Sequence, residues 1–299
     1  IAIGYAALGN LNNSSATRNI AIGQYAADGM GTLASLDNTF MGYDAGGGSW
    51  TGTLSSYNVG IGNYALGAAM DGAVHNTAIG YGATLALTEG TYNTAVGSKS
   101  GHALTTGTYN SYLGYFAGRY NATGGNNTYL GYQAGYGATG ENNSNNTAVG
   151  KDAMLAVTSG GTNVAIGALA GTAITTGTEN TAMGYSALPA LQTATGCTAV
   201  GRTALNATTG SYNTALGLNS GDLITTGTNN TIIGANSDAG ANDAVNQTCI
   251  GYGIGGVVDT DNSVVLGDSD VTDIYMAEDS GATVHCAGVN VTTGINFPD

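Results

Sequence analysis

The chain has 299 residues, of which 51 are glycine and 2 are proline, and only 8% are charged, against about 25% in an ordinary soluble domain. Its formal net charge of −14 disfavours nucleic acid and anionic membranes as partners. No stretch of the sequence reaches the roughly 18 apolar residues that span a bilayer, so we expect no membrane insertion. With 3 His, 3 Cys and 5 Lys and Arg, we expect no catalytic residues, no metal site and no cofactor.

One motif recurs from the first residues onward. The chain opens at Ile1 inside the pattern Asn-Thr-Ala-(Ile/Val)-Gly-x-x-Ala, so we expect it to be a segment of a longer polypeptide. An aliphatic residue (methionine included) precedes the glycine in all 16 copies, which succeed one another at 16 to 20 residues, mostly 17. A fixed period of this kind indicates a repeat architecture. We call these the anchor glycines: Gly4, Gly23, Gly42, Gly62, Gly80, Gly97, Gly114, Gly131, Gly150, Gly167, Gly184, Gly201, Gly217, Gly234, Gly251 and Gly267.

Each copy predicts a short strand that ends at the anchor glycine, where a positive φ permits a turn. A helix is disfavoured, because glycine at fixed places would cost it about 1 kcal/mol per residue. A second short stretch comes after a Thr-x-Gly turn seven residues before the next anchor, as at residues 88–90 and 105–107. Two short strands and two turns describe one coil. We therefore predict an all-β fold, a parallel β-solenoid (β-roll or β-helix) of about sixteen coils of ~17 residues.

Alternation along each strand bears on which side chains face inward, because neighbouring residues point to opposite faces. We expect the aliphatic residue before each anchor glycine to lie inside the coil, in a core column that includes Ile22, Ile79, Val96, Leu113, Ile166 and Ile233. The preceding residue is mostly alanine, and a small apolar side chain is not expected to face water. Such alanines predict the seam of a parallel homotrimer: Ala78, Ala95, Ala148, Ala165, Ala182 and Ala199. Larger residues there would mark levels where the chains stand further apart: Phe40, Tyr112 and Tyr129.

The period also places two polar columns. Asparagine lies four residues before the anchor in 12 of the 15 copies that reach back that far. These side chains either hydrogen-bond from coil to coil or act only as turn formers. Tyrosine often comes directly after the anchor, where it either packs over the turn or forms a surface on which a glycan stacks. The tyrosines of that possible glycan surface are Tyr81, Tyr115, Tyr132 and Tyr185.

The pattern ends near Asp268. We therefore predict a repetitive shaft of residues 1–268 and a C-terminal transitional β segment of residues 269–299. Five acids near this boundary would bind Ca²⁺ if they converged, although a solvated acidic face is favoured: Asp259, Asp261, Asp268, Asp270 and Asp273. The cysteines lack metal-ligand spacing. They are expected to be small buried side chains, with an interchain disulfide as the alternative: Cys197, Cys249 and Cys286.

The repeat unit, as at residues 76–83 and 180–187, resembles the repeats of bacteriophage tail-fibre and tail-spike proteins. It is also similar to the head repeats of trimeric autotransporter adhesins, whose unit is shorter. The stretches 262–268, 271–277 and 294–299 are similar to the segments that come after such repeats in phage fibres. The resemblance implies an extracellular, homotrimeric segment of a virion tail fibre that helps attach to the host. Other tail or fibre proteins and host surface glycans are the implied partners, and no catalytic residue carries over.

Three other functions compete with the fibre. A bacterial surface adhesin would use the same fold on a cell surface. A tail-spike glycan hydrolase would need two carboxylates about 5 to 9 Å apart, and the acids of the repeats occupy no recurring position. An ice-binding solenoid would need a regular threonine ladder, which the varying spacing of 16 to 20 residues disrupts.

Overall fold

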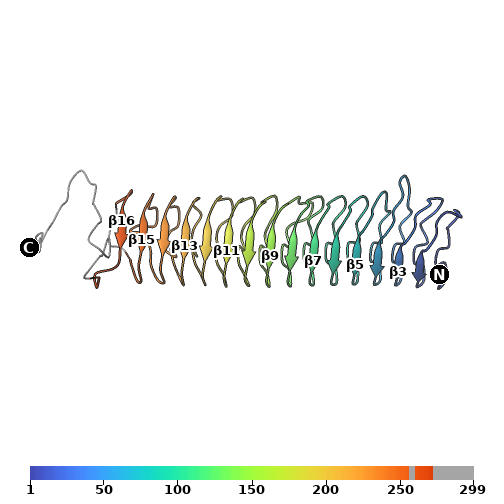
Figure 1. Ribbon diagram of the computed structural model, residues 1–299, viewed down its shortest axis with the longest axis horizontal. Coiled ribbons are helices and arrows are strands. Elements are labelled where there is room, and N and C mark those ends of the chain that lie inside the picture. Colours follow the sequence, from blue (N-terminus) through green and yellow to red (C-terminus); the bar gives the residue numbers. More distant parts are fainter. Residues whose placement is uncertain (256–259, 272–299) are drawn as a thin grey trace, which may run out of the picture. The chain divides into compact units, whose positions relative to one another are not determined.

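The computed structural model describes residues 1–255 and 260–271. The described part is an all-β parallel solenoid, as predicted, with sixteen strands in one sheet whose order matches the sequence. Figure 1 shows the strands as arrows side by side along the unit Ile1–Asp268. The strands are β1 (Ala2–Ile3), β2 (Ile20–Ile22), β3 (Thr39–Met41), β4 (Val59–Ile61), β5 (Thr77–Ile79), β6 (Thr94–Val96), β7 (Ser111–Leu113), β8 (Thr128–Leu130), β9 (Thr147–Val149), β10 (Val164–Ile166), β11 (Thr181–Met183), β12 (Thr198–Val200), β13 (Thr214–Leu216), β14 (Thr231–Ile233), β15 (Thr248–Ile250) and β16 (Val264–Leu266).

The register between coils matches the repeat. Ala78 pairs with Ala95 across β5 and β6, so equivalent residues of successive copies lie beside one another. The chain divides into two units, Ile1–Asp268 and Ser269–Asp299. Of the second unit, only residues 269–271 lie within the described part.

Each coil has one strand rather than the two that the sequence predicted. Beyond the strands, the described residues contain only two isolated bridges, Asn121 with Glu141 and Thr228 with Val245. The rest of each coil is a series of turns, held to the next coil by bonds such as that from the Thr105 amide to the carbonyl of Ala122 at 2.8 Å. Left-handed residues interrupt the chain too often for a second strand to form.

Glycine is required at the anchor positions for two reasons: the backbone has a positive φ there, and the next coil leaves no room for a Cβ. Gly97 has a φ of 134°, and a Cβ there would lie 2.5 Å from the carbonyl oxygen of Gly114 in the next coil. Because the same residue recurs in each coil, the glycines stack directly on one another. A side chain at this position would therefore both strain the backbone and force the coils apart.

The predicted inward and outward faces of the strands are reversed in the structure. The middle alanines, predicted as the seam between chains, lie inside their own coil with no exposed surface: Ala78, Ala95, Ala148, Ala165, Ala182 and Ala199. The predicted core column does stack in register, but it faces outward from the isolated chain. Ile79, Leu113 and Ile166 are 37%, 50% and 36% exposed, and Ile22, Val96 and Ile233 are half-buried.

The reason for the reversal lies in a third set of apolar residues. Seven residues after many anchors stands a large side chain that is fully buried, as at Leu87, Leu104 and Ile174. These side chains fill the narrow coil from the side opposite the strand. Only a small residue then fits where the strand points inward, because protein interiors are already close-packed.

The larger residues of the alanine column also lie inside the coil, so they do not mark levels where chains separate. The rings of Tyr112 and Tyr129 are buried and stack at 5.3 Å between centroids. Glycine makes room for them, since a Cβ on Gly118 would lie 2.7 Å from the ring of Tyr112. The Tyr112 hydroxyl accepts a hydrogen bond from the Asn121 amide at 2.9 Å. Phe40 packs edge-to-face on Trp50 at 5.7 Å.

The asparagine column forms a buried ladder of hydrogen bonds, interrupted where Cys197 replaces asparagine, and this confirms the first of the two interpretations. The Oδ1 of Asn163 accepts from the backbone N–H of Asn180 at 3.0 Å and from its Nδ2 at 3.1 Å. The Nδ2 of Asn163 donates to Gly177 O at 2.9 Å. Where the column has Cys197 or Gln247, the backbone N–H still donates to the preceding asparagine at 2.9 Å. The ladder thus ties each of these coils to the one before it.

We predict that Asn163→Ala lowers the free energy of unfolding by about 2 to 4 kcal/mol, because the Asn180 donors lose their acceptor inside the protein. Urea unfolding followed by circular dichroism measures this. The control is Thr162→Asn at the exposed neighbouring residue with a φ of 60°. Asparagine tolerates this conformation, so a change of at most about 0.5 kcal/mol is expected. Equal losses in both variants would contradict the ladder.

The reversed faces give a second prediction. Ala165→Leu should lower the free energy of unfolding by about 1 to 3 kcal/mol, because it overfills a closed interior. Ile166→Leu, one residue further on the outward face, is the control and should change it by less than about 0.5 kcal/mol. The same urea titrations compare the two variants. If Ala165→Leu left the free energy of unfolding unchanged, residue 165 would face outward, as the sequence predicted, and not into the coil.

Candidate binding surfaces

The residue before each anchor glycine forms an exposed apolar line along the outer face of the sheet. We call this line the aliphatic stripe. Its members reach 58% exposure at Ile3 and 48% at Leu216. Near Val96, Leu113 and Leu130 the surface is hollowed, with a volume of about 260 Å³. The stripe comprises Ile3, Ile22, Met41, Ile61, Ile79, Val96, Leu113, Leu130, Val149, Ile166, Met183, Val200, Leu216, Ile233, Ile250 and Leu266. A continuous exposed apolar surface is typical of an interaction site.

The four tyrosines predicted to form a glycan surface are exposed, at 51% for Tyr81, 44% for Tyr115, 46% for Tyr132 and 53% for Tyr185. Tyr115 and Tyr132 stack at 5.7 Å. Tyr81 belongs to another row, in which successive rings meet edge-to-face at 5.3 to 6.0 Å between centroids. That row is Tyr5, Tyr25, Tyr43, Tyr64 and Tyr81. The predicted tyrosines therefore do not form one unbroken ladder.

A second aromatic column escaped the sequence analysis. Tyr57, His75, Tyr92 and Tyr109 stack with centroids 4.8, 5.0 and 5.2 Å apart and ring planes within 9° of parallel. Each stands five residues before its anchor glycine and has a positive φ. The sequence did contain a signal for this column, because an aromatic ring recurs directly before the asparagine of the hydrogen-bonded ladder.

Near the middle of the shaft, basic and aromatic side chains of neighbouring coils come together. The Arg119 guanidinium carbon lies 4.1 Å from the centroid of Phe116, 4.7 Å from that of Tyr120 and 5.6 Å from that of Tyr136. Its Nη1 donates to Tyr136 Oη at 3.1 Å. Lys99 Nζ lies 5.9 Å from the centroid of Phe116. Guanidinium groups bind aromatic faces in this way through cation–π attraction.

His102 lies close enough to this group to be affected by its charge. Burial lowers the pKa of the His102 imidazole, and the charges of Arg119 and Lys99 lower it further. The neighbouring cations therefore favour the neutral form of the His102 imidazole.

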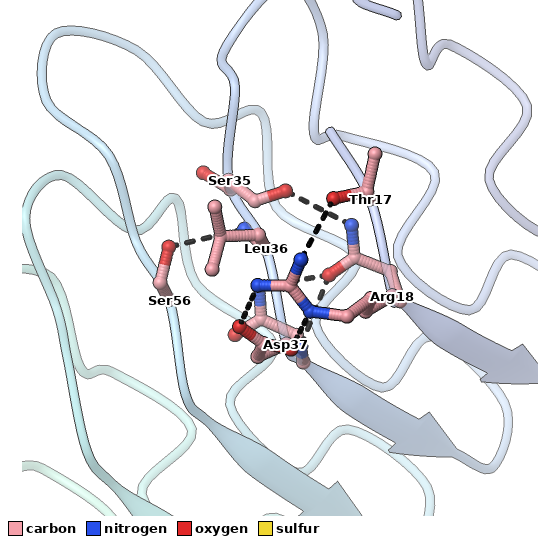
Figure 2. A network of polar contacts seen from close by, with 8 residues as sticks. Thr17, Arg18, Ser35, Leu36, Asp37 and Ser56 are labelled. Carbon is pink, nitrogen blue, oxygen red and sulfur yellow. Dashed lines mark hydrogen bonds and ion pairs between the residues drawn. The ribbon is translucent and has the colours of Figure 1, made fainter. Parts of the chain in front are cut away.

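Two other cations are neutralised by neighbouring acids. Figure 2 shows Arg18 reaching the Asp37 carboxylate, with Nε–Oδ1 and Nη2–Oδ2 distances of 2.6 Å. The hydrogen bond from Arg18 lowers the pKa of Asp37. Lys151 Nζ lies 2.6 Å from Asp152 Oδ2. Exposed pairs of this kind contribute little stability, but they cancel charge that a ligand would otherwise meet.

Among the described residues, the acids near the end of the shaft do not come together as a metal site. Asp259 and Asp273 lie outside the described residues, and within the described residues no group of three potential metal ligands occurs. Asp261 Oδ1 accepts a hydrogen bond from the Val245 amide at 2.8 Å. Cys197 and Cys249 are buried, as predicted, and form no disulfide with each other, while Cys286 lies outside the described residues.

No protein family, curated protein or solved structure matches this chain in the comparisons with known proteins. In the part of the chain that the structure describes, no helix has the length and apolar character needed to cross a membrane.

A buried acid gives a prediction on pH. Burial, together with a hydrogen bond that the protonated Asp238 carboxyl donates to Asp222, raises the pKa of Asp238 to about 8. Its proton is bound more tightly in the folded state, so its contribution to stability is full below about pH 4 and is lost as the pH rises to about 8, at up to about 1.4 kcal/mol per pH unit. Asp238→Asn, which stays neutral, should remove this dependence. Urea unfolding at pH 5, 6.5 and 8 tests it, and equal pH slopes in both proteins would contradict it.

Proposed function

We propose that this chain is a structural and adhesive segment of a homotrimeric fibre, of the bacteriophage tail-fibre type, that projects toward a host cell and helps attach to it. The observation that carries the proposal is the aliphatic stripe. It continues through all sixteen repeats without a charged residue. In this role the segment is extracellular, contacts other tail or fibre proteins, and acts by length and stiffness rather than by catalysis.

An identical copy is the partner that suits the stripe best. The stripe repeats once per coil, and only another chain of the same repeat presents an apolar side chain at every level. If each of its residues buried about 50 Å², the stripe would bury roughly 800 Å² per chain, which is the size of a standard stable interface. Contact between copies would thus cover a hydrophobic surface that a single narrow coil leaves in water.

The proposed arrangement is parallel and threefold. When chains run in the same direction, equivalent coils lie at the same level, and the small spread of periods from 16 to 20 residues is matched automatically. In a closed threefold ring the stripe of every chain is covered, so no further copies can add to the assembly through it. The trimer first inferred from the alanines is thus proposed again with the aliphatic stripe as its seam.

The proposal predicts a mass of three chains, each of 29.5 kDa, for the purified segment in multi-angle light scattering. The double variant Leu113→Lys, Leu130→Lys should be monomeric, because two charges per chain would be buried at the axis at a cost of several kcal/mol. Its circular dichroism should stay unchanged, since both side chains face outward.

The matched control is Thr106→Lys, Thr123→Lys. It adds the same charges to exposed positions of the same coils, away from the stripe. This variant should remain trimeric. A wild-type chain that is monomeric at micromolar concentration, or a stripe variant that stays trimeric, would contradict the proposed assembly.

A further inference from the structure

Basic side chains are concentrated where the chain has no acids. Between Glu89 and Glu141 the sequence contains no Asp or Glu, yet it contains Lys99, His102 and Arg119. The whole chain has a formal net charge of −14. This stretch is therefore a local cationic surface on a strongly acidic shaft.

The cations of this stretch have no acidic partner, in contrast to Arg18 and Lys151. Among the described residues, ion pairs join only Arg18 to Asp37 and Lys151 to Asp152. Arg119 also has a buried Nε without a hydrogen-bond partner. That atom is itself buried and out of a ligand's reach, but no acid neutralises the charges of Lys99 and Arg119, so they can pair with an anion.

Aromatic rings surround these cations. Lys99 Nζ lies 5.8 Å from the ring of Tyr81, and Arg119 is in contact with the rings of Phe116, Tyr120 and Tyr136. We call the six residues the cation–aromatic cluster: Tyr81, Lys99, Phe116, Arg119, Tyr120 and Tyr136. Its members come from four successive coils, so the cluster extends along the shaft.

The cluster lies on the turns that leave the sheet. Its residues come one to six positions after their anchor glycines, whereas the stripe residues precede them. Association through the stripe therefore leaves the two neighbouring turns that bear Arg119, Tyr120 and Tyr136 free for a ligand.

We propose that the cation–aromatic cluster binds an acidic carbohydrate. The C–H faces of a sugar ring pack on the tyrosine and phenylalanine rings, and its carboxylate or phosphate pairs with Lys99 and Arg119. A neutral glycan would use only the rings, and a simple anion only the cations. The source of this carbohydrate rests on the proposed function: if the chain helps attach to a host cell, the ligand is a glycan on the surface of that cell.

Isothermal titration of the full chain with three carbohydrates tests the proposal. Oligogalacturonate supplies carboxylates, a phosphorylated mannan supplies phosphates, and dextran is neutral. At least one acidic carbohydrate should bind about tenfold more tightly than dextran, and which one binds identifies the anionic group. Lys99→Gln and Arg119→Gln should each weaken binding about tenfold, as expected for loss of a charge-assisted hydrogen bond.

Arg202→Gln is the matched control, because Arg202 is exposed, lies outside the cluster and has no ion pair among the described residues. It loses the same charge and should change the dissociation constant less than twofold. Lys99→Gln replaces only the charged end of a long side chain, so it keeps the test valid even if Arg119→Gln disturbs the coil. Equal effects of Lys99→Gln and Arg202→Gln, or no binding of either acidic carbohydrate at millimolar concentration, would overturn the proposal.

The outcomes separate this site from the fibre. A monomer that binds an acidic carbohydrate through Lys99 and Arg119 contradicts the trimer and supports the site. A trimer that binds neither acidic carbohydrate contradicts the site and leaves the fibre standing.

Discussion

Most coils of this solenoid bury an asparagine amide, and the hydrogen bonds of that amide hold neighbouring coils in register. An amide placed inside each coil must find partners there, because an unpaired buried polar group costs on the order of 1 to 3 kcal/mol. The Oδ1 of Asn163 finds them in the next coil, at the backbone and side chain of Asn180. This requirement fixes the register and brings the anchor glycines of successive coils into contact. One repeated hydrogen bond thus fixes the stacking of the shaft.

The close stacking of the coils also determines which surfaces remain exposed for binding partners. The interior of each coil is narrow, and residues such as Leu104 and Ile174 fill most of it. The strand contributes an alanine to the interior and presents its aliphatic residue to the outside. A coil this thin cannot cover all its apolar surface. We infer that the surplus is covered between copies, which makes assembly a consequence of the coil's dimensions.

The sequence was sufficient for the period and for the strand before each anchor glycine, since both come directly from the repeat. It also predicted a second strand per coil that does not form, and it left open whether the asparagines pair. It was not sufficient for the direction of the side chains. Ala165 and Ile166 are both apolar, so alternation says that they face opposite ways without saying which faces inward. The deciding residue, Ile174, competes for the interior from the far side of the coil. The cluster around Arg119 was missed because its contacts join neighbouring coils: Arg119 and Tyr136 lie 17 residues apart.

The claim that the aliphatic stripe joins copies of the chain is tested most directly by disulfide crosslinking at two adjacent positions. Oxidation of Ile166→Cys should give covalent dimers on a denaturing gel, because equivalent residues of the copies would meet at the axis. Ala165→Cys, closed inside its own coil, should give none, as should the wild-type chain with its buried Cys197 and Cys249. Dimers from Ala165→Cys and none from Ile166→Cys would contradict the account.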